Sequence, residues 1–479
     1  MHTRLTVERV LHSVVAALHH VCCGYSGPSR KPTMLIDRRE LMMGLGAAAM
    51  VNPVLAVGRP ANVTQAGELA QAAAEAWIYI LSLIESANAR AAVLAGTAVN
   101  TLFRLREPTT PATQRVTTPN NDTLNARAWI DLRNGPVTIT LPPTGDRYFS
   151  AAMMDMYSNN FAVLGTRTTG GAGGSYTIVG PGGTTDDRRA IRSPTPWMWV
   201  LIRLLTTGGD DLTAARIVQD GFRIDGATAI AQPSPFARRT ENWRRVFASA
   251  QALMIENPPP ATDDAVLRRI APLGILPGGG FDSSRFTPSQ IAAIDAGVAA
   301  AQQMLLAGGA QGPVVAGWAY PRANLGNFAQ DYQYRAQTAL NGFAALPVNE
   351  AMYLFAAGPS GNMRLDSASS WRLRLPAGRL PPVDAFWSLT AYEAAPDGQF
   401  FLFDNSAHRY SVGDRTPGFK RGPGGSVDIV VSRTAPASAT ANWLPAPIKV
   451  SLGLVFRCYR PKSALIDGSY RLPALERLA

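Results

Sequence analysis

Residues 117–142 read TTPNNDTLNARAWIDLRNGPVTITLP, and this stretch is the clearest guide to the fold. Two asparagines, an aspartate and a threonine follow Pro119, and a strand-like run begins directly behind them. A second strand-like run, Pro136–Leu141, comes after an Asn-Gly turn, and a third covers Arg147–Tyr157. Short strands at such intervals predict an antiparallel β-sandwich.

The surrounding sequence predicts a plan of strands, then helices, then strands again. Apolar residues recur at helical spacing from Thr64 to about Ala92. The pattern from about 186 to 345 is helical, and Thr287-Pro288-Ser289-Gln290 opens one of its helices with a capping box. We therefore expect an N-terminal β-sandwich module at 60–185, a helical connector at 186–345 and a C-terminal β-sandwich module at 346–479.

The N-terminus carries the features of a twin-arginine export signal. Arg38 and Arg39 precede a short apolar run, Gly44 to Val57, which contains a small-residue cleavage site. This pattern predicts a signal peptide at 34–57, an over-extended N-terminus at 1–33 with the true start at Met1 or Met34, and a periplasmic or extracellular location. The alternative is an arginine pair that happens to precede an alanine-rich helix.

Removal of this leader leaves Cys458 and His408 as the remaining cysteine and histidine. A lone cysteine forms no disulfide within the chain, and a metal site built from histidine or cysteine is excluded in the mature chain. The cofactor is therefore unknown, and a carboxylate-bound Ca or Mg ion stays open.

The formal charge of +11 comes from 45 basic residues, of which four are lysines. No block of five or six like charges occurs, so we expect no nucleic-acid partner. The run at the leader is too short to span a bilayer, and no transmembrane segment is expected after its removal. The expected partner is a small-molecule or carbohydrate ligand, and the oligomeric state is left open.

Several motifs resemble a known bacterial family. TPNNDTLNARAWIDLRNGPVTITLP, GDRYFSAAMMDMYSNNFAVLGTRTTG and SYTIVGPG are similar to domain of unknown function 1254. LPPVDAFWSLTAY, DNSAHRYSVGDR, NWLPAP and FRCYRP are similar to its usual companion, domain of unknown function 1214. The resemblance implies two jelly-roll-like antiparallel β-sandwich domains with helical insertions, usually in exported proteins. It implies no reaction.

The candidate catalytic residues are Asp122, Asp155 and Tyr157. Strand alternation places Asp155 and Tyr157 on one face of the run that follows Gly145, where a carboxylate could act as a general base. Asp122 and Asp155 could form the carboxylate pair of a glycoside-cleaving enzyme, which their separation would decide. Alternatively, Asp155 pairs with Arg147 or Arg167 as a buried structural bridge.

The candidate ligand-binding residues lie in loops or at the junction of the two modules. They are Asn120, Asn121, Thr123, Arg335, Tyr353, Trp387, Asn405, Arg409, Tyr410 and Trp443. Each has a plainer interpretation. Asn120 and Asn121 suit Asx-turns. Trp387 suits the core, because it shares an apolar stripe with Leu389 and Ala391, and Trp443 suits a buried corner. Arg409 could clamp a substrate carboxylate or close its loop on Asp404.

These residues favour an exported enzyme of hydrolase or lyase type, acting on a polar small-molecule or carbohydrate-like substrate in an interdomain cleft. The alternative is a non-catalytic cell-envelope protein that binds carbohydrate or lipid through Trp387 and Trp443. A purely structural role is the third interpretation.

Overall fold

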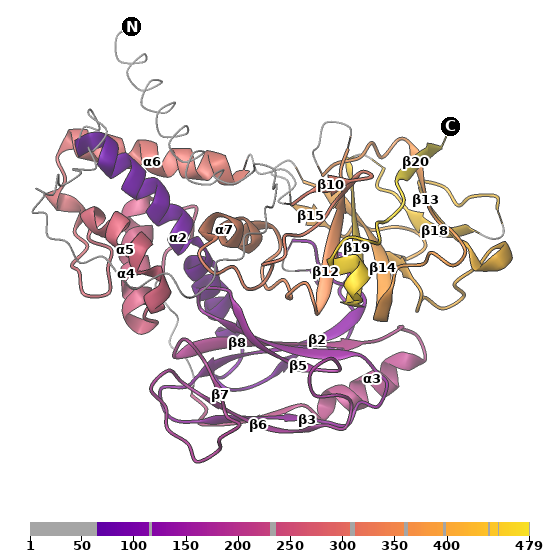
Figure 1. Ribbon diagram of the computed structural model, residues 1–479, viewed down its shortest axis with the longest axis horizontal. Helices are drawn as coiled ribbons and strands as arrows, with labels where there is room; N and C mark the ends of the chain where they lie inside the picture. The colour runs from indigo at the N-terminus through magenta and orange to yellow at the C-terminus, as the bar shows by residue number, and fades with distance from the viewer. Residues whose placement is uncertain are drawn as a thin grey trace, which may run out of the picture.

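The structure is a computed structural model that describes residues 65–114, 117–229, 236–306, 312–358, 363–395, 399–438, 441–448 and 450–478. The predicted export signal at 34–57 and the stretch 1–33 lie outside the described residues. Figure 1 shows three parts, two β-sandwiches and a group of helices. None of the helices in the described part is both long and apolar enough to cross a membrane.

The N-terminal sandwich packs a five-stranded sheet against a four-stranded sheet. The five-stranded sheet runs in the order β1 (Phe103–Arg104), β2 (Thr123–Asp131), β8 (Trp197–Leu205), β4 (Phe149–Asp155) and β5 (Asn160–Gly165). The four-stranded sheet runs β7 (Ile191–Arg192), β6 (Gly174–Val179), β3 (Val137–Leu141) and β9 (Arg223–Asp225). Ala128, Ile139 and Val200 fill the core between them. Because side chains alternate along a strand, the odd-numbered residues of β2 and β8 lie on the outer face of the five-stranded sheet. Helix α3 (Asp211–Asp220) follows β8.

The C-terminal sandwich packs a seven-stranded sheet against another four-stranded sheet. The larger sheet runs β10 (Val314–Val315), β11 (Trp318–Ala319), β12 (Ala351–Ala356), β19 (Leu452–Pro461), β14 (Val383–Ala394) and β15 (Phe400–Phe401), with β16 (Ser411–Gly413) also paired to β14. The smaller one runs β18 (Ala441–Pro445), β17 (Val427–Ser432), β13 (Ser370–Leu375) and β20 (Leu475–Leu478), and the short helix α8 (Ser463–Ile466) follows β19. Leu389, Ile429 and Phe456 are among the residues buried between the sheets.

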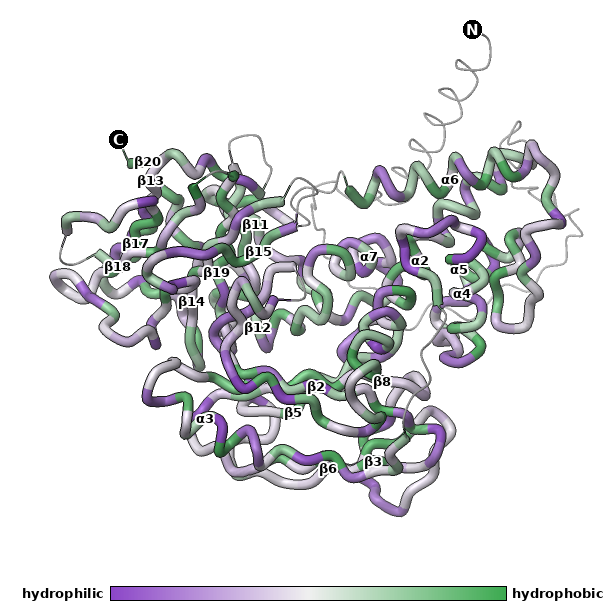
Figure 2. The backbone as a smooth tube through the Cα atoms, turned by 180° about the vertical axis from the view of Figure 1, so that it is seen from behind, coloured by the Kyte–Doolittle hydropathy of each residue, from purple (hydrophilic) through white to green (hydrophobic). Residues whose placement is uncertain are grey.

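The helices pack around α2 (Gln65–Leu94). The others are α4 (Trp243–Glu256), α5 (Asp264–Ile270), α6 (Pro288–Leu306) and α7 (Tyr332–Asn341), with short 3₁₀ turns at Ala261–Asp263, Ala271–Leu273 and Ser283–Arg285. The predicted capping box is present, because Thr287 and Gln290 exchange hydrogen bonds of 2.9 and 3.3 Å. Figures 1 and 2 both place α7 between the other helices and the C-terminal sheets.

The predicted fold class is confirmed: the chain is mainly β, with two sandwiches joined by helices. The strands nevertheless cross the boundaries expected at residues 185 and 346. β8 and β9 lie beyond 185, and β10 and β11 lie before 346. β8 is a run of apolar residues, interrupted by Arg203, that is buried between β2 and β4, and periodicity alone does not separate such a run from a buried helix. α2, in turn, packs with the connector helices.

Candidate functional site

The polar loop, residues 117–123, leads into β2 of the N-terminal sandwich and makes hydrogen bonds to the C-terminal sandwich. The Thr118 amide donates to the Phe400 carbonyl at 2.7 Å. The Pro119 carbonyl accepts from the Tyr392 hydroxyl at 2.7 Å, and the Thr118 carbonyl accepts from the Arg457 guanidinium at 3.1 Å. Thr118 has φ of 54°, a strained value for a β-branched residue, and these bonds hold it there. The loop is therefore a structural joint between the two modules.

The face of β14 that receives this loop is the polar stripe expected from FWSLTAY. Ser388 donates to the Asp122 carboxylate at 2.7 Å, and Thr390 accepts from Arg457 at 2.8 Å. The alternate residues Trp387 and Leu389 face the other way, into the sandwich core. Alternation along one strand thus divides the core from the junction.

Asp122 is sealed within this joint. Besides Ser388, it accepts from the Ser411 hydroxyl at 3.2 Å. Burial raises the pKa of Asp122, although Arg457 and the two serines act in the opposite direction. The two hydroxyl contacts and this burial are typical of a structural carboxylate and do not support the predicted catalytic role.

Asn120, Asn121 and Thr123 form the turn at the end of the loop. The amide oxygen of Asn120 accepts from the Asp122 backbone at 2.6 Å, which is the Asx-turn expected from the sequence. Asn121 donates to the Thr109 carbonyl at 2.6 Å. Asn120 also lines the cavity described below, whereas Asn121 and Thr123 support it from behind. The stretch is both a turn and the wall of a site.

Asp155 lies far from Asp122, so the two cannot form a glycosidase pair. In the sheet register, Thr123 is opposite Leu205 of β8, whereas Asp155 is opposite Met198. Seven residues along β8 correspond to roughly 23 Å at about 3.3 Å per residue. A retaining or inverting pair needs about 5 to 10 Å. The predicted pairing is wrong because β2 and β4 run in the same direction, with one carboxylate before its strand and the other at its end.

Asp155 also lacks the arginine partners that the alternative interpretation assigned to it. Arg147 binds Asp211 at 2.6 Å, and Arg167 binds Glu350 at 2.6 Å. Asp155 instead accepts from the backbone amide of its neighbour Asn159 at 2.9 Å. Burial raises the pKa of Asp155 to about 6.

Tyr157 and Arg335 belong to a buried cluster that joins α2, α7 and the end of β4. The Tyr157 hydroxyl donates to the Asn257 carbonyl at 2.9 Å. Arg335 donates to the Tyr79 carbonyl at 2.9 Å, and its guanidinium carbon lies 5.0 to 5.6 Å from the ring centres of Tyr79, Tyr157 and Tyr332. Both side chains are essentially inaccessible, which suits a structural role.

Except for Tyr353, the remaining candidates of the C-terminal module do not line the main cavity described below. Trp387 stacks on Phe456 in the core, with ring centres 5.3 Å apart, and Tyr410 is buried in a smaller cluster. Asn405 closes its own loop by donating to the Arg409 carbonyl at 3.1 Å. Arg409 binds the Trp443 carbonyl at 3.0 Å rather than Asp404. Arg409 and Trp443 border a small hollow of about 240 Å³ that is separate from the main cavity.

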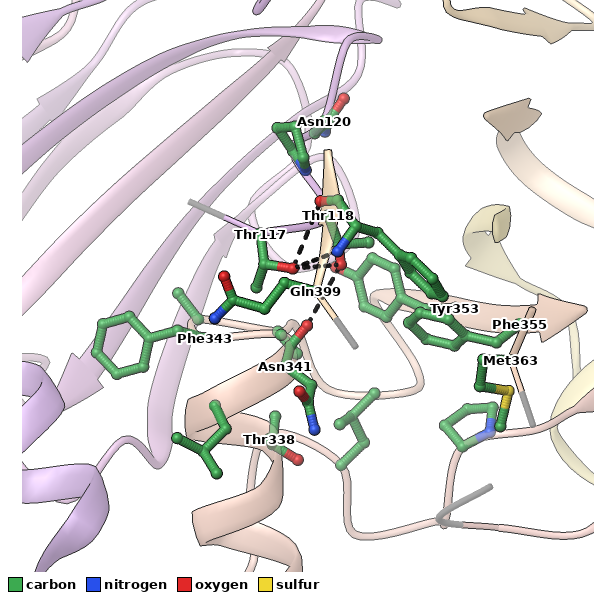
Figure 3. A pocket seen from close by; sticks show the side chains of 18 of the residues that line it. Thr117, Thr118, Asn120, Thr338, Asn341, Phe343, Tyr353, Phe355, Met363 and Gln399 are labelled. Carbon is green, nitrogen blue, oxygen red and sulfur yellow. Dashed lines mark hydrogen bonds between the residues drawn. The ribbon is translucent and has the colours of Figure 1, made fainter. Parts of the chain in front are cut away.

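The main cavity, here called the junction cavity, measures about 980 Å³ and takes walls from all three parts of the molecule. Figure 3 shows one end of it, where Thr118 and Asn341 lie opposite Tyr353 and Phe355. Among the predicted residues, Asn120 and Tyr353 line it. Its apolar lining includes Trp77, Leu81, Trp199, Leu201, Leu305, Leu340, Phe343, Phe355, Met363 and Phe400. The volume lies at the upper end of the usual range for ligand pockets.

The charges that line the junction cavity have one sign. Its described lining contains no aspartate or glutamate, but it contains Arg127, Arg203, Arg239, Arg364 and Arg457. Arg239 is neutralised by Glu85 at 3.0 Å. Arg457 is fully buried in the joint, where Tyr392 also accepts from it at 2.7 Å.

Arg127 and Arg203 have no carboxylate partner in the described part of the chain, although Arg203 donates to the Ala344 carbonyl and Arg127 lies over the Phe103 ring. Within the described residues, neither lies within 4 Å of a carboxylate, as the ion pairs of this region involve other arginines. The Nε of Arg127 and the Nη1 of Arg203 are buried and have no hydrogen-bond partner. Burial lowers the pKa of Arg127, with no neighbouring charge to oppose it. Two such cations on one wall produce a positive potential inside the cavity.

Two features of the sequence mark these residues, namely strand alternation and a charge inside an apolar run. Arg127 belongs to NARAWID, where alternation places it opposite the core-facing alanines, and Arg203 interrupts the apolar run of β8. Arg457 and Tyr459 alternate in the same way within FRCYRP. A charged residue inside a buried strand needs a partner or a ligand.

A metal site is not evident in the described part of the chain, where no three histidine, cysteine, aspartate or glutamate side chains gather as ligands. The fold and the junction cavity define the class: two β-sandwiches and a helical group that jointly enclose a large site. Residues 99–226 match the family model "Protein of unknown function (DUF1254)", and residues 350–463 match "Protein of unknown function (DUF1214)". The chain belongs to the family of proteins that combine these two domains in this order.

One solved structure has the same fold, and a second is less similar. The VPA0106 protein from Vibrio parahaemolyticus is 22% identical, with a TM-score of 0.64 over 86% of this chain and 100% of its own. An uncharacterized protein from Burkholderia cenocepacia is 14% identical, with a TM-score of 0.44 over 85% of this chain and 88% of its own. At these identities the first likeness establishes the fold alone, and the second carries no argument. No curated protein matches the chain.

Proposed function

We propose that this protein binds a small organic anion in the junction cavity. The observation that carries the proposal is the pair Arg127 and Arg203, two lining cations that no described carboxylate neutralises. Burying a cation is costly unless it is paired, so an anionic ligand would supply the missing partner. Arginines on the protein surface are hydrated and would need no such partner.

The apolar lining indicates that the ligand is organic rather than a bare inorganic ion. Trp199 stacks on Phe343 with ring centres 5.4 Å apart, and both line the cavity beside Leu201. Aromatic and aliphatic surface of this kind is stabilised by burying a hydrophobic group. A neutral carbohydrate, one of the two ligand classes expected from the sequence, would leave the two arginines without a countercharge.

The geometry favours binding over hydrolysis or elimination. Asp122, Asp155 and Tyr157, the predicted catalytic group, do not line the cavity. A general base must come within hydrogen-bond reach of the proton that it removes. The non-catalytic interpretation is therefore the better supported one, with the ligand site at the junction instead of at Trp387 and Trp443.

We propose further that binding takes place outside the cytoplasm. The support is the arginine pair Arg38 and Arg39, followed by the short apolar run to Val57. An exported binding protein of the periplasm or cell surface would meet organic anions from the environment.

The binding proposal is tested with 8-anilinonaphthalene-1-sulfonate, an aromatic anion whose fluorescence rises in apolar sites. The double variant Arg127→Met and Arg203→Met should weaken a saturable site at least tenfold, since hydrogen bonds to charged groups contribute roughly 1.5–3 kcal/mol each. Arg188→Met with Arg189→Met removes the same charge from an exposed loop and should change nothing. Equal affinity in both double variants, or no saturable binding to the wild type, would overturn the proposal.

A further inference from the structure

One backbone amide determines the hydrogen-bond directions along the cavity wall. The N–H of Asp122 donates to Asn120 at 2.6 Å, so the atom that it meets must be the amide oxygen of Asn120. The amide nitrogen of Asn120 then has to donate its two hydrogens. Its two partners are the Tyr459 hydroxyl at 2.8 Å and the Thr123 hydroxyl at 3.0 Å.

The first consequence concerns Tyr459. Because its hydroxyl oxygen accepts from Asn120, its own hydrogen is left for another acceptor, and none of the described residues provides one. Burial raises the pKa of Tyr459 well above its usual value, so the hydroxyl keeps its hydrogen at neutral pH. Tyr459 borders the junction cavity and its side chain is fully buried, so this hydrogen is a buried donor without a partner in the described part of the chain.

The second consequence concerns Asn125. The Thr123 hydroxyl accepts from Asn120 and so donates its hydrogen to the side-chain oxygen of Asn125 at 3.2 Å. This leaves the amide nitrogen of Asn125 as a donor without an acceptor in the described part of the chain. Asn125 also lines the cavity. Asn120 and Thr123 act here as positioning residues, since they orient the donors without being the donors.

The two arginines complete the same wall. Arg203 lies directly opposite Asn125 in the β2–β8 pairing, and Arg127 is two residues further along the same face of β2. One Nη of Arg203 donates to the Ala344 carbonyl at 2.9 Å, whereas the other has no partner although the residue is 91% buried. Asn125, Arg127, Arg203 and Tyr459 together are called the donor wall.

We propose that the donor wall recognises a carboxylate group, so that the ligand is an alkyl or aryl carboxylate. This inference rests on the proposed function. Each unused group on the wall is a donor, and an ionised carboxylate is acceptor-only, with about four lone-pair positions on two oxygens. Arginine forks match that planar group, and the charge-assisted bonds are roughly twice as strong as neutral ones. The Trp199 and Phe343 rings would take the apolar remainder of the molecule.

The test compares matched acids and amides by isothermal titration calorimetry. The pairs are 4-phenylbutyrate with 4-phenylbutanamide, 1-naphthylacetate with 1-naphthylacetamide, and octanoate with octanamide. We expect the acid to bind at least tenfold more tightly than its amide in at least one pair. The amide has an NH2 group in place of one carboxylate oxygen, and this group would face the N–H and O–H donors of the wall.

Variants assign this preference to residues. Tyr459→Phe and Asn125→Leu should each reduce the acid-over-amide preference about tenfold, the value of one hydrogen bond to a charged group. Asn120→Asp should act like Tyr459→Phe, because the new carboxylate draws the tyrosine hydrogen out of the cavity. The control is Tyr148→Phe, whose hydroxyl donates to Glu350 at 2.9 Å and not to the cavity. It should leave the preference unchanged whatever it does to stability.

The outcomes separate the two proposals. Equal affinities for acid and amide in every pair would overturn the carboxylate assignment, and the binding proposal would then be decided by the sulfonate experiment with the arginine double variant. Absence of binding by all six compounds, together with no saturable binding of the aromatic sulfonate, would overturn both. If the preference for acid over amide is unchanged in both Tyr459→Phe and Asn125→Leu, the donor wall does not recognise the carboxylate. Thermal melts confirm folding, and either variant alone is enough for the test.

Discussion

Asp155→Asn should make the protein more stable at neutral pH but not at acidic pH. Burial raises the pKa of Asp155 in the folded state to about 6, whereas an unfolded aspartate titrates near 3.9. Between these values the folded chain holds a proton that the unfolded chain has released. The free energy of unfolding therefore falls as pH rises through this window, and it is greatest below the unfolded pKa.

The magnitude follows from the shift of about two pKa units, which corresponds to roughly 3 kcal/mol lost between pH 4 and pH 7. Asparagine has no charge to bury and escapes this loss. It does lose the 3.5 Å contact with the Asn159 amide nitrogen, where two donors would then meet. That loss costs about 1 kcal/mol at every pH and shifts the whole curve without tilting it.

The assay is urea denaturation followed by tryptophan fluorescence at half-unit steps from pH 4 to pH 7. The quantity of interest is the unfolding free energy of the variant minus that of the wild type, which should rise by roughly 3 kcal/mol across the range. Asp146→Asn, at an exposed carboxylate in the loop before β4, is the control and should show no such rise. A difference that is flat with pH, or that falls, would refute the reasoning.

Two further predictions test assignments made above. Trp387→Ala should lower the free energy of unfolding by about 3–5 kcal/mol in urea denaturation, because Trp387 fills the C-terminal core; an unchanged midpoint would contradict that placement. Arg38→Lys with Arg39→Lys should retain the protein in the cytoplasm in a fractionation experiment, and normal export of this double variant would remove the case for a twin-arginine signal.

Strand texture and turn chemistry were enough to predict the sandwiches. The alternation of FWSLTAY separated the core residue Trp387 from the junction residue Ser388, and the alternation of TLNARAWID marked β2. Short-range pattern suffices there because each side chain's face follows from its position in the strand. β8 was missed because an apolar run buried on both sides has no period to detect.

The site was harder to predict than the fold, because it is made from pairings that are distant in sequence. Asn120 meets Tyr459 across 339 positions, and nothing local in either motif indicates that contact. The two aspartates chosen as a pair lie near one another in the sequence but at opposite ends of a sheet. Uncompensated arginines such as Arg203 were the better guide, since an unpaired charge in a buried strand requires an explanation.

The junction cavity is formed jointly by all three parts of the molecule. The strand that carries Arg127 comes from the N-terminal sandwich, Tyr459 comes from the C-terminal one, and helices α2, α6 and α7 add further lining residues. Either sandwich by itself would carry only a fragment of the cavity wall. When two separately produced halves are mixed, the proposed ligand binding should return only if the polar loop again contacts the C-terminal sandwich. Binding by mixed fragments would therefore depend on both assembly and an intact cavity.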